Sequence, residues 1–390
     1  MRPDISQRLK AALLLAPLLA FMLSFFVVPL VTMMKSAVSD PVATEALPRT
    51  ARALSDWDRS GTPPATAQAA LADDIRALRN DEQFGDLVRR LNSAQSGFRS
   101  LLGKTRRALD GAGTVDLANI DSRWTETSYW VTIGEAVASP WTDKNLLAAV
   151  DLERNSAGNV AAMPEGASAN RLIMIRTFVT SALVTLACIL IGLPYAMVAA
   201  SVEGWRRQVL LGAVLLPLWT SLLVRTAAWY VVLQDNGLIN ATLRGLGLTS
   251  GPVPLMFNRL GVVIAMTHVL LPFMVLPIFS VLIAIPRNLM PAAASLGAHP
   301  LRAFLHVLLP LSMRGVVSGA LLVFMAALGY YITPALIGGA NDQMISSVIA
   351  YYATGAANWG MAGALGLVLL VMTILLYAIY MRLTVEEQRA

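Results

Sequence analysis

Six apolar stretches limit what this 390-residue chain can fold into. A helix needs about 20 apolar residues to cross a hydrocarbon core roughly 30 Å thick, and each stretch is long enough. The stretches cover residues 11–34, 172–200, 208–233, 260–285, 314–337 and 361–381. Only 14% of the residues are charged, against roughly 25% in soluble domains. The sequence therefore predicts an all-α polytopic membrane protein with six transmembrane helices.

The first stretch differs from a secretory signal in its length. Residues 11–34 form a run of 24 residues, whereas the apolar part of a signal peptide has about 7–15. We therefore expect a retained first helix, which together with the short segment before it makes up residues 1–34.

Basic residues in the short connecting segments predict the orientation of the chain. With the N-terminus inside, the inner segments hold ten Arg and Lys residues and the short outer loops hold two. The inner ones are Arg2, Arg8, Lys10, Arg206, Arg207, Arg287, Arg302, Arg314, Arg382 and Arg389, and the outer ones are Arg244 and Arg259. Because Lys and Arg concentrate in cytoplasmic loops, both termini are predicted to be cytoplasmic, including the tail 386–390.

A long polar segment, residues 35–170, separates the first span from the second and is predicted to lie in the periplasm. It holds 15 Lys/Arg and 18 Asp/Glu. Apolar residues recur there at helical spacing, as in Leu71, Ile75 and Leu78. We expect a small, mainly helical extracytoplasmic domain. Its aromatic residues are expected in the core or at the membrane interface: Trp124, Tyr129, Trp130 and Trp141.

Few residues could support catalysis or metal binding. The single cysteine, Cys188, and the three histidines show no metal-ligand spacing. Residues 97–105 resemble a phosphate-binding loop, but five residues rather than four separate Gly97 from Gly103, and no strand precedes them. We expect a solvated amphipathic helix there. The sequence thus predicts a protein that is not an enzyme, binds no metal or cofactor of its own and has no nucleic-acid partner.

Residues 286–312 form the most informative inner segment, between the fourth and fifth spans. The small residues 292–294 would allow close approach to another surface, and Gly297 permits a sharp turn before Pro300. An amphipathic stretch follows and ends at Leu309-Pro310. This pattern predicts two short helices with a break between them. By spacing alone it fits an ordinary interfacial loop better than a docking surface.

The same segment resembles the cytoplasmic loop of type I ABC importer permeases, in which Glu-Ala-Ala is followed by three further residues and then Gly, and further on by Leu-Pro. Ala292 and Ala293 match the alanines and Gly297 the glycine, while Pro291 replaces the glutamate. The resemblance implies a coupling helix over about 289–302 that docks on an ATPase subunit. The residues that it assigns to coupling are Ala292, Ala293, Ser295, Leu296, Gly297, Ala298, Pro300, Phe304 and Pro310.

The likeness extends over about 171–385, the expected five-helix permease core. Within it the segments that are similar to the spermidine/putrescine-type branch are 176–196, 219–229, 236–240 and 271–277. The resemblance implies a subunit of an ATP-driven importer in the bacterial inner membrane, passing a small polar solute, with a polyamine favoured, by alternating access. It implies as partners two ATPase subunits that use ATP and Mg, a second permease chain that is expected to be homologous, a periplasmic solute-binding protein and membrane lipid.

Arg225 lies within the third predicted span, where a charge costs about 2.5–3.5 kcal/mol on insertion scales. It could line the solute pathway, or it could be a structural partner for Asp235 or for carbonyls at a helix end, and the sequence does not choose between them. The candidate pathway residues are Trp219, Arg225, Trp229, Tyr230 and Asp235.

Two alternatives to a polyamine permease stay open. The first is a permease of the same class for another small organic solute, such as an amino-acid derivative, an opine or a phosphonate. The second is an ion-coupled secondary transporter, which would need acids within the membrane, and the membrane part offers few besides Asp235 and Asp342.

Overall fold

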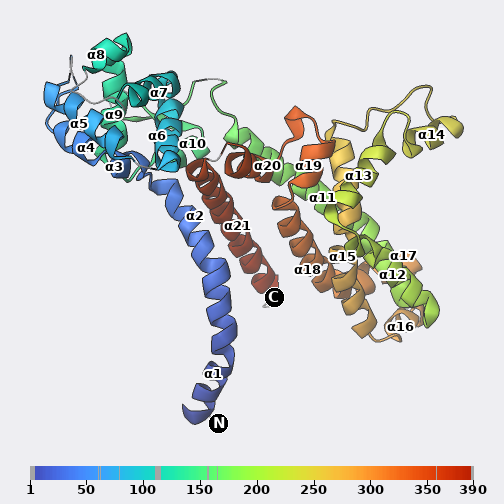
Figure 1. Cartoon of the computed structure of the whole chain (residues 1–390). Helices are drawn as coiled ribbons and strands as arrows, with labels where there is room; N and C mark the ends of the chain where they lie inside the picture. The colour runs from blue at the N-terminus through green and yellow to red at the C-terminus, as the bar shows by residue number, and fades with distance from the viewer. Residues whose placement is uncertain are drawn as a thin grey trace. The chain divides into compact units, whose positions relative to one another are not determined.

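The computed structural model describes residues 5–59, 61, 63–78, 80–109, 116–155, 158–164, 166–356 and 358–387 (Figure 1). The chain divides into two compact units. The first comprises residues up to Leu147 together with Trp359–Ala364, and the second comprises Ala148–Asn358 and the residues from Leu365 onward. Helices dominate both units, so the predicted all-α polytopic fold is confirmed.

The first unit begins with a long apolar helix. It runs through α1 (Ile5–Met22), the π-helical turn η1 (Leu23–Val27) and α2 (Val28–Val38) without a break (Figure 1). Residues Leu13–Val38 are long and apolar enough to span a membrane, as predicted for the first helix. Pro29 explains the π-turn, because its ring would collide with the carbonyl four residues earlier and the wider turn relieves that contact.

The polar insertion folds as short helices around a core of its own. The helices are α3 (Val42–Ala46), α4 (Pro48–Ala53), α5 (Ala65–Ala77), α6 (Asp81–Ala94), α7 (Phe98–Leu109), α8 (Leu117–Ile120), the 3-10 turn η2 (Ser122–Thr125), α9 (Thr127–Ala138) and α10 (Lys144–Ala149). The core holds Leu71, Phe98, Trp124 and Trp130. Trp141, expected to join the other aromatics, is 62% exposed and lies outside this core.

The two ends of the insertion's helical domain pair with each other just after α2. Ser39 and Trp141 form an antiparallel bridge. The amide of Asp40 donates to the carbonyl of Pro140 at 2.7 Å, and that of Thr142 donates to Val38 at 2.9 Å. The chain between Asp40 and Pro140 therefore begins and ends at neighbouring points of the backbone.

The start of the last long helix, α21 (Trp359–Glu387), packs on α2 within the first unit. A Cβ atom on Gly363 would lie 2.3 Å from the carbonyl oxygen of Met33, and one on Gly360 would lie 3.1 Å from that of Ser36. Only residues without a side chain allow this close approach.

The second unit opens with a hairpin and then the second span. Strands β1 (Leu152–Arg154) and β2 (Val160–Ala162) pair antiparallel. Asp151 caps α11 (Asn170–Ser201), because its carboxylate accepts from the amides of Asn170 and Arg171, each at 2.9 Å. Residues 148–170, which the sequence analysis assigned to the insertion, thus belong by their contacts to the second unit. The cap ties them to α11.

Three helices make the centre of the second unit: α11, α15 (Arg259–Ala284) and α18 (Leu309–Leu328). Their shared core includes Cys188, Met274 and Val323, all fully buried. Glycines bring α18 onto α15, since a Cβ on Gly315 would lie 2.8 Å from the Cα of Ile278 and one on Gly319 would lie 3.0 Å from the carbonyl of Met274.

The third predicted span, 208–233, is not one helix. It consists of α12 (Trp205–Trp219) and α13 (Leu222–Leu233), and the helices on the two sides of the break diverge by 101°. Ser221 accepts a hydrogen bond from the amide of Val224 at 3.2 Å and so caps a new helix at the break. The described residues therefore contain five straight helices able to span a membrane, or six if the bent pair counts as one span.

The fifth span also differs from its prediction of 314–337. The straight candidate helix covers Pro300–Leu328, and a separate short helix, α19 (Ile332–Ile337), follows it. The remaining elements of the second unit are α14 (Leu238–Gly245), the 3-10 turn η4 (Ala340–Asp342), α20 (Ile345–Ala350) and the π-helical turn η5 (Tyr351–Gly355).

Candidate functional site

The coupling segment, defined here as residues 286–312, starts with the helix α16 (Leu289–Ser295). Gly297 ends this helix in a left-handed conformation with φ of +83°. The amide of Ala298 donates to the carbonyl of Ala293 at 3.0 Å, and that of Gly297 donates to Ala294 at 2.9 Å. This is the double hydrogen bond of a Schellman motif, which uses glycine at this position. The predicted break after Gly297 is confirmed.

The second helix of the coupling segment is the beginning of a membrane span. It starts as α17 (Pro300–Ala303) and continues through the π-helical turn η3 (Phe304–Leu308) into α18. The prediction of a separate short helix ending at Leu309-Pro310 is therefore wrong. The helix continues past Pro310. The π-turn before this proline is wider than an α-helical turn, and it moves the carbonyl four residues earlier away from the proline ring.

The α16 end of the coupling segment is uncovered. Helix α16 has no buried residue, and the side chain of Leu296 is 89% exposed. Of the residues predicted to couple, six are exposed and three are half-buried. The exposed ones are Ala292, Ser295, Leu296, Gly297, Pro300 and Pro310, and the half-buried ones are Ala293, Ala298 and Phe304. Helix α16 is only partly covered along one side, so its exposed residues are free to meet another protein or the lipid surface.

Pro291 occupies the third position of α16. The amides of the first turn of a helix have no partner inside the helix, so a proline there removes no hydrogen bond. Its carbonyl accepts from the hydroxyl of Ser295 at 3.0 Å. The helix therefore forms without the glutamate that the resemblance led us to expect at this position.

One ion pair joins the two inner loops beside the coupling segment. Arg287 contacts Glu203, which lies between α11 and α12. The hydrogen bond from Arg287 lowers the pKa of the Glu203 carboxyl below its ordinary value, and the charge of the same arginine adds to this. Both side chains are largely exposed, so the pair contributes little stability and chiefly neutralises two charges.

Arg225, in the middle of α13, turns toward the break before its helix. Its guanidinium donates to the carbonyl of Thr220 at 2.7 Å, which is one of the two structural alternatives left open by the sequence. No ion pair joins it to Asp235 or to any other carboxylate in the described part of the chain. Its Nε atom is buried and has no hydrogen-bond partner there.

Trp229, one turn after Arg225, brings in a residue that the sequence analysis did not select. Its indole donates to Nδ1 of His268 at 3.1 Å, and the two ring centres lie 5.3 Å apart. His268 belongs to α15 and lies within electrostatic reach of Arg225, as does Tyr330. A single histidine in an apolar run gives no periodic signal, so only the packing of α13 on α15 identifies it.

The other predicted pathway residues do not join this cluster through polar contacts. Trp219 ends α12 and is 79% exposed, Tyr230 is 38% exposed, and Asp235 lies exposed after α13. Among the described residues, no hydrogen bond or ion pair connects these three to Arg225. The structure thus groups Arg225 and Trp229 with His268.

Asn240 holds the outer loop of this region together. It is fully buried, its amide donates to the carbonyls of Gln234 and Val253, and its oxygen accepts from the amide of Val253 at 2.8 Å. Gly237 is required beside it, since a Cβ there would lie 2.4 Å from the carbonyl of Val232. The 236–240 motif therefore has a structural role: it fixes the backbone on both sides of α14.

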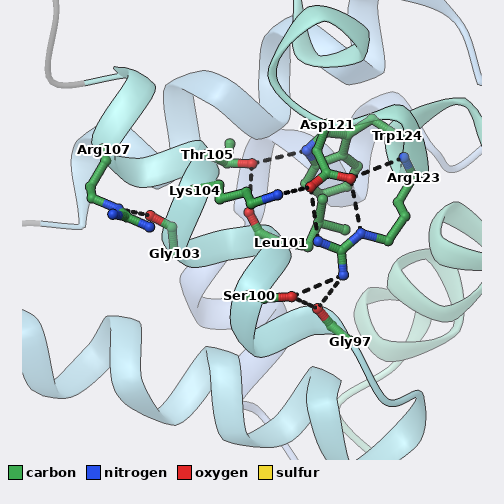
Figure 2. Close-up of polar contacts among 10 residues, drawn as sticks. All are labelled: Gly97, Ser100, Leu101, Gly103, Lys104, Thr105, Arg107, Asp121, Arg123 and Trp124. Carbon is green, nitrogen blue, oxygen red and sulfur yellow. Dashed lines mark hydrogen bonds and ion pairs between the residues drawn. The ribbon is translucent and has the colours of Figure 1, made fainter.

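The segment that resembles a phosphate-binding loop is a helix, as expected, and its basic residue is engaged (Figure 2). Lys104 donates to Asp121 at 2.9 Å, and Arg123 donates to the same carboxylate through two nitrogens, each at 2.9 Å. Thr105 is buried and accepts from the indole of Trp124. These contacts join α7 to η2, so the residues build the insertion's core.

Asp121 is the electrostatic centre of that cluster. Hydrogen bonds from Arg123, then from Lys104, hold the pKa of its carboxyl well below the ordinary range. The same carboxylate raises the pKa of Arg123. The charged pair is therefore part of the folded state of the insertion at neutral pH.

Comparisons with known proteins place the second unit. A family model described as "Binding-protein-dependent transport system inner membrane component" matches residues 157–384. The spermidine/putrescine transport system permease protein PotB of Haemophilus influenzae is 35% identical over 52% of this chain and 71% of its own length. PotB of Escherichia coli K12 is 31% identical over 54% of this chain and 76% of its own length. The molybdenum transport system permease protein ModB of Mycobacterium bovis is 30% identical over 50% of this chain and 73% of its own length.

Among solved structures, a similar chain occurs in a bacterial alginate ABC transporter in complex with an alginate pentasaccharide-bound periplasmic protein. The TM-score is 0.46 and the identity 17%, over 55% of this chain and 78% of that chain.

Proposed function

Because the chain belongs to the family of binding-protein-dependent transport system inner membrane components, we propose that it conducts a small polar solute and takes its driving force from separate ATPase subunits. It is an ABC importer permease of the PotB type. In this proposal the chain binds no cofactor, and ATP and Mg act in the partner ATPase.

A polyamine such as putrescine or spermidine is the solute that we propose first. Relatives named for spermidine/putrescine transport support it, although the relative named for molybdenum transport shows that such permeases serve different cargoes. Of the outer acids, Asp342 is already 3.5 Å from Arg259, which leaves Asp235. A membrane part with so few carboxylates is suited to passage, with affinity supplied by a periplasmic binding protein.

The coupling role is carried by one observation: the exposed helix α16 is joined by a short turn to a helix that continues through the membrane unit. Four residues join α16 to the continuous helix that begins at Pro300 and runs through η3 into α18. A displacement of α16 would therefore reach α18, which contacts the core helix α15 through Gly315 and Gly319. We propose that ATPase closure moves α16 and tilts these helices as a body, which opens the pathway on alternate sides.

Substitution of the turn tests this role. In vesicles that contain the complete transporter, Gly297→Glu and Ala293→Asp should abolish solute uptake while ATP hydrolysis continues. Gly297 has the left-handed φ that disfavours a side chain, and Ala293 lies on the helix that would dock. Gly212→Ala, a change in open space in α12, is the control and should transport normally. Full uptake by both variants would contradict the coupling role.

The orientation belongs to the same proposal: both termini and α16 in the cytoplasm, and the insertion in the periplasm. The chain has one cysteine, Cys188, which is buried. In a Cys188→Ala background, Ala294→Cys should react with a membrane-impermeant maleimide only after the cells are opened. Ser93→Cys, on the insertion, should react in intact outer-membrane-permeabilised cells. Labelling of both from the same side would contradict the orientation.

A further inference from the structure

The break in the third predicted span leaves the end of a helix in the second unit. Helix α12 ends at Trp219, and Thr220 after it has extended backbone angles. The last carbonyls of a helix have no donor within the helix, and they carry the negative end of the helix dipole. In membrane transporters, such ends of interrupted helices hold cations. The end of α12 can therefore bind a cation through backbone oxygen, without a carboxylate.

Arg225 already fills this helix end with its own positive charge. Its side chain reaches back five residues along the chain and donates to the carbonyl of Thr220 at 2.7 Å. Among the residues that the structure describes, no acid forms an ion pair with Arg225. The charge is therefore balanced by the helix end. An anion has poor access to the guanidinium, because the Nε atom is buried and one terminal nitrogen is engaged by the carbonyl.

Aromatic rings lie beside the same helix end. Trp229 follows Arg225 by one helical turn, and the hydrogen bond from its indole to Nδ1 of His268, at 3.1 Å, holds the ring. Tyr330 lies within electrostatic reach of the Arg225 guanidinium, as His268 does. The faces of indole and phenol rings attract cations. A backbone carbonyl and aromatic rings together form the kind of site that binds an ammonium or a guanidinium group.

We propose that Arg225 occupies the site that a primary ammonium group of the solute takes during transport, with the carbonyl of Thr220 as the acceptor and the ring of Trp229 beside it. This inference rests on the proposed function, because it takes the solute to be a polyamine. The solute displaces the guanidinium from Thr220, and the repulsion between the two positive charges keeps the solute from staying. Arg225 thus makes the site weak and short-lived, which suits passage.

Removal of the resident cation tests the proposal. The purified complex of permease and ATPase subunits, without a binding protein, is titrated with radiolabelled spermidine. Arg225→Met should bind spermidine about tenfold more tightly than the unsubstituted complex, since one neighbouring like charge is gone. Arg225→Lys keeps a cation and should bind as weakly as the unsubstituted complex. Arg244→Met is the matched control, because it removes an exposed arginine of α14, and it should leave the affinity unchanged.

The aromatic ring gives a second readout. In the Arg225→Met background, Trp229→Phe should bind spermidine about threefold more tightly than Trp229→Leu. Both substitutions lose the hydrogen bond to His268, so the difference between them measures the ring face. Methylguanidinium, a free copy of the arginine head group, should displace spermidine from Arg225→Met. Succinate, an anion with a four-carbon chain like that of putrescine, should not displace it.

The outcomes distinguish the inference from the proposed function. If the unsubstituted transporter takes up spermidine in vesicles but Arg225→Met binds it no more tightly, the shared site is refuted and the importer stands. Succinate binding that Arg225→Met abolishes would make Arg225 an anion contact and also refute it. If Arg225→Met does not assemble with the ATPase subunits, Arg225→Gln, whose amide can still donate to Thr220, carries the same expectation. No uptake of spermidine or putrescine by the unsubstituted transporter would refute the proposed solute itself.

Discussion

At the scale of single residues, the polar groups of this chain do mostly structural work. Asp151 caps α11, Asn240 staples the outer loop, and Asp121 gathers Lys104 and Arg123. Each holds together parts of the backbone or side chains that are separated in the sequence. Arg225 is an exception, because its Nε atom is buried without a hydrogen-bond partner among the described residues, and it is a candidate for function.

The lowered pKa of Asp121 makes the stability of the insertion depend on pH. A carboxyl whose folded pKa lies below its unfolded value stabilises the fold above the unfolded pKa, about 4, and loses that contribution as pH falls through the folded pKa. Asp121→Asn should therefore cost about 2 kcal/mol at pH 7. The cost should shrink as pH falls below about 4.

Hydrogen exchange of the α7 amides in the full chain measures this difference at each pH. The exposed Asp56, which has no ion pair or hydrogen bond among the described residues, supplies the control Asp56→Asn, expected to change nothing. A loss of protection in Asp121→Asn that stays constant from pH 7 to the acid limit would mean that charge is not the source of the stability.

At the scale of elements, small residues set how closely the helices approach. The Gly315 and Gly319 pair could have served an interface with a second permease or packing within the chain. The structure uses it inside the chain, against the backbone of Ile278 and Met274 on α15. Two π-turns, before Pro29 and Pro310, let long helices pass prolines without ending, which is why the fifth span begins further back than its apolar run.

Gly315 is the position at which a methyl group should be least tolerated. A Cβ there would lie 2.8 Å from the Cα of Ile278 and 3.0 Å from the carbonyl of Pro277, and backbone atoms cannot rotate away. Gly315→Ala should cost about 1–3 kcal/mol and lower the temperature at which the detergent-solubilised protein aggregates. Gly212→Ala, in the helical α12 with open space around it, should be neutral or slightly stabilising. Equal melting of the two variants would show that the helices can separate without cost.

At the scale of the whole molecule, the insertion is a module added to a permease. The family match covers 157–384 and leaves the insertion's core outside. Its chain begins and ends beside one backbone bridge, between Ser39 and Trp141. A module whose ends meet can be gained or lost without redirecting the helices that flank it.

Replacement of residues 41–139 by a short Gly-Ser linker tests this modularity. The amide of Asp40 and the carbonyl of Pro140 are 2.7 Å apart, so a few residues can close the gap. We expect the shortened chain to insert in the membrane and to retain the proposed ATPase subunit at the level of the full chain, measured by co-purification. A full-length chain in which 41–139 is kept but Leu71 and Trp124 are changed to Ser controls for a misfolded insertion. Degradation of the shortened chain alone would show that the insertion is needed for folding.

The sequence by itself determined that the chain is a polytopic membrane protein. The thickness of the hydrocarbon core sets the length that a span needs, and both the apolar runs and the charges of the loops can be read from the sequence. It also determined the break at Gly297, since a left-handed turn at the end of a helix favours a residue without a side chain. Only the tertiary structure decided the 101° bend at Ser221, the partnership of Trp229 with His268 and the engagement of Lys104 by Asp121. Each of these depends on residues far apart in the chain or on a competition between capping and helix continuation, and hydropathy and periodicity record neither.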